Sequence, residues 1–110
     1  MTKEEVLNQF ATDFSDPGSE KSGEYLREHV LRRAERIVQS DRSGLVEAMR
    51  DWLQRRSLPH TLLAVAVAQE ARLTELVPDL HSLRDDILAS RFLRDTQEDL
   101  VDQALAVLEP

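Results

Sequence analysis

Apolar side chains recur every three or four residues along most of the chain, a period that predicts amphipathic α-helices rather than strands. Each apolar stripe is expected to form the buried face of one helix. The five stripes are Val6, Leu7, Phe10 and Phe14; Leu26, Val30, Ala34, Ile37 and Val38; Leu45, Ala48, Met49, Trp52 and Leu53; Leu76, Leu80, Leu83 and Ile87; and Leu100, Val101, Ala104, Leu105 and Leu108. Leu, Arg, Glu and Ala are abundant and Gln adds to them, so helix propensity agrees with the period.

Glycine and proline are rare, with 3 and 4 copies, and together with capping residues they set the expected helix ends. Thr2 and Glu5 have the spacing of a capping box, in which each side chain satisfies a free backbone N–H. The other expected N-caps are Asp41 or Ser43, then Thr74, then Asp95 or Thr96. Helices are therefore expected over residues 3–13, 23–39, 44–56 and 75–89, with a last helix that ends at 108.

One further helix is expected to differ in kind, because residues 62–68 are apolar all round. In a soluble protein a helix without a polar face is surrounded by neighbours. Seven residues span roughly 10 Å, which is too short to cross a membrane. Pro59 suits the first turn of this helix, where its missing N–H costs nothing. We therefore predict that this segment is the central helix of the fold.

Six helices joined by short loops predict an all-α fold with antiparallel neighbours. The length of 110 residues indicates a single domain, with N-terminal helices over 1–57 and a second group over 58–108. Two architectures fit this reading, a compact stack of helical hairpins and a globular helical bundle.

The second half of the chain resembles a HEAT-type repeat. It carries Pro59, the small apolar run 64–68, the phrase Leu76-Val77-Pro78-Asp79-Leu80, and then Leu83 and Asp86. The residues after 95 resemble the first helix of a following repeat, whereas the N-terminal half departs from the pattern. The resemblance implies a compact HEAT-like hairpin stack that serves as a protein-binding surface. It also implies that the second helix of the hairpin lines the surface that faces the partner.

Composition narrows the chemistry that this chain can perform. The absence of cysteine excludes disulfides and thiol chemistry, and a net charge of −7 argues against binding to nucleic acid or an anionic membrane. The three histidines lack metal-ligand spacing, and the adjacent pairs Asp85-Asp86 and Glu98-Asp99 point in diverging directions on a helix. We therefore expect a cytoplasmic protein without catalytic residues, metal or cofactor, and no enzyme activity.

The distribution of charge is the most informative feature for function. Residues 1–57 hold 10 basic and 11 acidic side chains, whereas residues 58–110 hold 4 basic and 10 acidic ones. Glu75, Asp79, Ser82 and Asp86 follow one another at helical spacing, so they are expected to form one exposed row beside the apolar stripe. The carboxylates expected to meet a partner are Glu75, Asp79, Asp86, Asp99 and Asp102. We call these five residues the acidic ridge.

The acidic ridge predicts a protein that binds a basic partner protein without enzyme chemistry. The alternative is a small acidic immunity or antitoxin-type protein that inhibits a basic toxin. Solubility alone also explains an acidic surface. Self-association is a further alternative, because the basic residues His29, Arg32, Arg33 and Arg36 share one side of the second expected helix. Such a contact would be head-to-tail.

Overall fold

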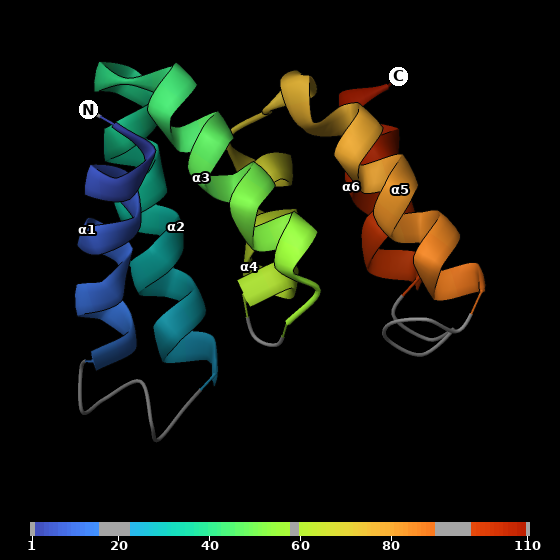
Figure 1. Cartoon of the computed structure of the whole chain (residues 1–110), viewed down its shortest axis with the longest axis horizontal. Helices are drawn as coiled ribbons and strands as arrows, with labels where there is room; N and C mark the ends of the chain where they lie inside the picture. The colour runs from blue at the N-terminus through green and yellow to red at the C-terminus, as the bar shows by residue number, and fades with distance from the viewer. Residues whose placement is uncertain (1, 16–22, 58–59, 90–97, 110) are drawn as a thin grey trace. The chain divides into compact units, whose positions relative to one another are not determined.

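A computed structural model describes residues 2–15, 23–57, 60–89 and 98–109, and within these residues all regular secondary structure is helical (Figure 1). The elements are α1 (Lys3–Ser15), α2 (Gly23–Ser40), α3 (Arg42–Arg55), α4 (His60–Glu70), a 3₁₀ turn η2 (Thr74–Leu76), α5 (Val77–Leu88) and α6 (Glu98–Leu108). The prediction of an all-α fold with six α-helices is confirmed for these ranges.

The chain divides into two compact units, residues 1–48 and 49–110. The boundary lies inside α3, whereas the sequence suggested a boundary after residue 57. The division assigns the C-terminal half of α3 and its arginines to the second unit. That the whole chain forms one domain stays a prediction.

In the first unit, α1 and α2 pack side by side and bury the stripes that the period predicts. Val6 and Phe10 of α1 and Val30 of α2 are fully buried. Leu7, Phe14 and Val38 lie at the margins of these stripes and are only partly buried. The prediction of the buried faces is therefore confirmed at their centres.

The two expected caps in this unit stabilise the starts of α1 and α3. The Oγ1 of Thr2 accepts the backbone N–H of Glu5 at 3.2 Å. The hydroxyl of Thr2 also donates to the carboxylate of Glu5 at 3.4 Å, so the side chains bond to each other. Asp41 rather than Ser43 caps α3, because its Oδ1 accepts the N–H of Gly44 at 3.0 Å.

An ion pair that the sequence analysis did not anticipate joins α1 to α2. Asp13 is buried, and its carboxylate accepts two hydrogen bonds from Arg33, 2.7 Å from Nε to Oδ2 and 3.2 Å from Nη2 to Oδ1. The hydrogen bonds to Asp13 raise the pKa of Arg33, which therefore keeps its charge. Arg33 thus serves the core of the first unit and is not part of a free basic row.

In the second unit, α6 packs against both α4 and α5 (Figure 1). The buried side chains are Leu63, Ala64, Val65, Val67 and Ala68 of α4; Leu80, Leu83 and Ile87 of α5; and Val101, Ala104, Leu105 and Leu108 of α6. Two expectations are wrong at the margins. Leu62 and Ala66 share one edge of α4 and are only partly buried, and Leu100 of α6 is exposed.

These pairings bear on the HEAT-like resemblance. A hairpin of that type implies that α4 and α5 pack tightly against each other along their length. The close pairings in the second unit are instead α4 with α6 and α5 with α6. The compact helical arrangement is therefore shown, and the HEAT-like repeat is not confirmed.

The start of α5 also differs from the prediction. Residues 74–76 form a 3₁₀ turn, Leu76 is the N-cap residue of α5, and Thr74 does not cap that helix. The reason is Pro78, which lacks the N–H that an α-helix would need to bond to the carbonyl of Thr74. That carbonyl instead accepts the N–H of Val77, which is the tighter bond of a 3₁₀ turn. The expected caps Asp95 and Thr96 lie outside the described residues.

None of the helices in the described ranges has both the length and the apolar character needed to span a membrane.

Candidate partner-binding surface

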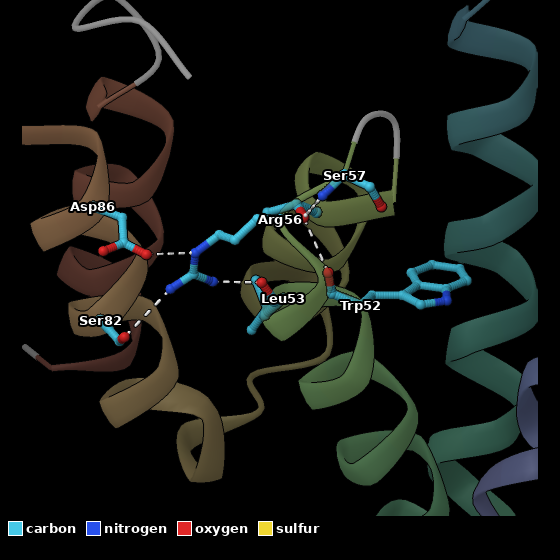
Figure 2. Close-up of polar contacts among 7 residues, drawn as sticks. Trp52, Leu53, Arg56, Ser57, Ser82 and Asp86 are labelled. Atoms are coloured by element: carbon cyan, nitrogen blue, oxygen red, sulfur yellow. Dashed lines mark hydrogen bonds and ion pairs between the residues drawn. The ribbon is translucent and has the colours of Figure 1, made fainter. Parts of the chain in front are cut away.

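The edge of α5 that carries Asp79, Ser82 and Asp86 faces the arginines at the end of α3. The Nε of Arg50 donates to Oδ2 of Asp79 at 3.1 Å. The Nε of Arg56 donates to Oδ2 of Asp86 at 2.8 Å, and its Nη2 donates to the hydroxyl of Ser82 at 3.3 Å (Figure 2). This part of the acidic ridge therefore joins α5 to α3 within the second unit.

Arg56 reaches this position because it follows the last residue of α3 in a left-handed backbone conformation, with φ of 51°. Glycine usually ends a helix in this way, and an L-residue there costs roughly 1–2 kcal/mol. The Nη1 of Arg56 donates to the carbonyl of Leu53, one of the free carbonyls at the helix end (Figure 2). The bonds to Leu53, Ser82 and Asp86 together offset the backbone cost.

Thr61 of α4 completes the end of α3. Its hydroxyl donates to the carbonyl of Trp52 at 3.0 Å and accepts the N–H of Ser57 at 3.1 Å (Figure 2). Thr61 is fully buried, so these two bonds satisfy a polar group that would otherwise be costly in the core. Thr61 therefore bonds the first turn of α4 to the end of α3, next to Arg56.

The structure thus divides the five carboxylates of the acidic ridge by their surroundings. Only 16% of the Asp79 side chain and 27% of the Asp86 side chain are exposed to solvent, so the expectation that both are freely exposed is wrong. Glu75 is exposed but lies on the 3₁₀ turn rather than on α5, and its backbone carbonyl accepts a hydrogen bond from Arg50. Asp99 is exposed on α6, and the side chain of Asp102 keeps 45% of its exposure.

The opposite edge of α5 faces α6. The Nε of Arg84 donates to Oδ1 of Asp102 at 2.8 Å, and Nε2 of His81 lies 3.1 Å from the carboxylate of Glu109. All four side chains remain between about a third and a half exposed. At this exposure such ion pairs contribute little stability, on the order of 0–1 kcal/mol each. They therefore mark a solvated seam between the two helices.

Two exposed rows flank this seam. On α5 the row is His81, Asp85 and Leu88, and on α6 it is Asp99, Gln103 and Ala106. We call these six residues, with Arg84, Asp102 and Glu109 of the seam, the α5–α6 outer face. It holds one arginine and four carboxylates, so its net charge is −3 with His81 neutral. No partner role was predicted for Asp85 or Glu109 from the sequence, although the spacing of Asp85 from Leu83 and Ile87 places it outside the core.

The division into two units also changes the charge balance that the sequence suggested. Residues 1–48 hold 7 basic and 10 acidic side chains, and residues 49–110 hold 7 basic and 11 acidic ones. The net charges are therefore −3 and −4, because the arginines of α3 belong to the second unit. The α5–α6 outer face holds four of the eleven carboxylates of the second unit and one of its seven basic side chains.

The basic row expected on α2 is used in part within the first unit. Arg33 bonds to Asp13, and Arg32 lies 4.0 Å from Glu28 in an exposed i,i+4 pair. The ring of His29 lies against Tyr25, with 4.2 Å between the ring centroids. This row therefore presents less free positive charge than the sequence predicts.

His60 lies at the start of α4, and its ring meets the edge of Trp52 with 5.4 Å between the centroids. Burial lowers the pKa of His60, Arg55 lowers it further, and Asp51 opposes the change. Its folded-state pKa is thus below the ordinary value, so the folded protein holds the neutral ring.

This position predicts how stability changes with pH. As pH falls through about 6.5, the unfolded chain binds a proton at His60 before the folded chain does. The free energy of unfolding should therefore fall between about pH 7 and pH 5.5, and His60→Asn should make that fall shallower. Urea unfolding of both proteins across this range measures the difference. Parallel curves would show that His60 does not contribute.

Among the described residues, no three His, Cys, Asp or Glu side chains gather in an arrangement that could hold a metal ion. Comparisons with known proteins find no matching family model, no matching curated protein and no matching solved structure.

Proposed function

We propose that this chain is a protein-interaction domain without enzyme activity, and that it binds a basic partner protein through the α5–α6 outer face. The observation that carries the proposal is the separation of the carboxylates into two groups. Asp79 and Asp86 are partly buried and bonded to arginines of the same unit, whereas Asp85 and Asp99 are exposed on α5 and α6. Carboxylates on a solvated face remain available to a partner.

The physical role of such a face is to direct the encounter with a partner of opposite charge. Charged side chains at the rim of an interface mainly raise the association rate, and the gain falls as salt screens the charges. The net charge of −3 on the outer face of α5 and α6 produces a negative potential that attracts a basic partner to this side of the unit. If the HEAT-like resemblance holds, α5 is also the helix that would face the partner.

The test begins with capture of binding proteins from the source cell, followed by mass spectrometry and kinetic measurement with the purified partner. We expect Asp85→Lys with Asp99→Lys to slow association at least about tenfold at low salt, and less at high salt. The control is Glu24→Lys with Glu35→Lys on α2, which changes the net charge equally on exposed sites of the first unit.

The two double variants distinguish a binding face from a general charge effect. The control should keep most of the wild-type association rate. Equal slowing by both variants would contradict the proposal, because net charge alone would then account for the rate.

A further inference from the structure

Leu88 is the large apolar side chain of the α5–α6 outer face, and 52% of it is exposed. It occupies the last residue of α5, and the N–H of Ala89 bonds to the carbonyl of Asp85 at 3.0 Å, so the helix backbone is regular up to this point. Its position on the face is therefore set by the helix.

Both helices also contribute carboxylates to this face. Asp85 precedes it by three residues on the same face of α5. The Arg84–Asp102 pair joins α5 to α6, and Asp99 lies one turn before Asp102 on the exposed side of α6. The α5–α6 outer face therefore carries an exposed leucine together with carboxylates of both helices.

An apolar centre with a charged rim is the usual composition of a protein interface. We infer that the partner meets this face with a basic amphipathic helix, whose apolar side chain covers Leu88 while its lysines or arginines face Asp85 and Asp99. The inference rests on the proposed function and names the kind of segment that binds. Charge complementarity selects this occupant, because the surrounding face is acidic.

The carboxylates and Leu88 should affect different rate constants of binding to the same surface. Loss of a rim carboxylate should lower the association rate, whereas loss of the apolar contact should raise the dissociation rate. Leu100 provides a matched control, because it is a leucine of similar exposure, 45%, on α6. It lies about 200° around the helix from Asp102 and so faces away from the seam.

The experiment measures binding of two synthetic peptides of equal charge, an amphipathic helix of leucine and lysine and a peptide of serine and lysine. We expect the leucine–lysine peptide to bind the wild type at least about tenfold more tightly than the serine–lysine peptide. Leu88→Ser should remove most of this difference by faster dissociation, and Leu100→Ser should leave it in place.

Three results would overturn the inference. Equal binding of the two peptides, with no effect of Leu88→Ser, would leave the proposed function standing and remove the apolar contact. Absence of binding by either peptide would show that the face does not accept a basic helix. Self-association of the chain that depends on Leu88, seen by sedimentation, would show that a second copy is the occupant.

Discussion

Ala64→Asp is expected to prevent folding of the second unit. Ala64 is fully buried in α4, the helix that packs against α6. An unpaired carboxylate there has no counter-charge, and a buried charge without a partner costs about 3–5 kcal/mol. That loss is comparable with the whole stability of a small unit, which is roughly 0.1 kcal/mol per residue. Far-UV circular dichroism and urea unfolding measure the effect.

The choice of position depends on the structure. The apolar run 62–68 suggested Ala66, but that residue lies on a partly exposed edge, where a carboxylate could reach water. The matched control is Glu70→Gln, an exposed change at the end of the same helix, which should alter the free energy of unfolding by less than about 0.5 kcal/mol. If both variants unfolded at the wild-type urea concentration, α4 would not be the core helix of its unit.

Asp13→Ala has the second largest expected effect. It removes the carboxylate that accepts both hydrogen bonds of Arg33 and leaves a guanidinium only 28% exposed. Breaking a buried pair costs about 3–5 kcal/mol, and the partial exposure of Arg33 reduces this to about 2–3 kcal/mol. The free energy of unfolding, measured with urea, should fall by that amount.

A double variant tests the cause of that loss. Asp13→Leu with Arg33→Met removes both charges and keeps apolar volume between α1 and α2. It should recover most of the stability, because a well-packed apolar pair avoids the desolvation of two charges. If the double variant were as unstable as Asp13→Ala, packing around Asp13 rather than the unpaired charge would explain the loss.

The helices could be predicted from the sequence because their apolar stripes are long and regular. Val6, Val30 and Leu83 are buried where the helical period placed them. The prediction failed where one residue alters a local rule. Pro78 shifts the start of α5 to residue 77, because proline cannot donate a backbone hydrogen bond. Leu100 was predicted to belong to the buried stripe of α6, but it lies beside that stripe and is exposed.

The partners of the acidic ridge could not be predicted in the same way. The spacing of Asp79 and Asp86 shows that they share a face of a helix, but it does not show which helix that face meets. Their partners Arg50 and Arg56 lie 29 and 30 residues earlier in the chain. Arg56 itself adopts the left-handed conformation at the end of α3, a position where glycine is the usual residue, so the sequence does not indicate it.

The central claim is that the carboxylates of α5 that face α3 stabilise the fold, whereas those on the α5–α6 outer face bind the partner. Two double variants with equal change of net charge compare them, Asp79→Asn with Asp86→Asn, and Asp85→Asn with Asp99→Asn. The measurement is the free energy of unfolding and the rate of association with an oligolysine peptide, taken on both variants and the wild type.

The first variant should lose about 1–2 kcal/mol of stability, because hydrogen bonds between charged groups weaken, and should associate at nearly the wild-type rate. The second should keep its stability within about 0.5 kcal/mol and associate more slowly. A second variant that associated as fast as the wild type, or a first variant that was as stable as the wild type, would contradict the division of roles between the two groups of carboxylates.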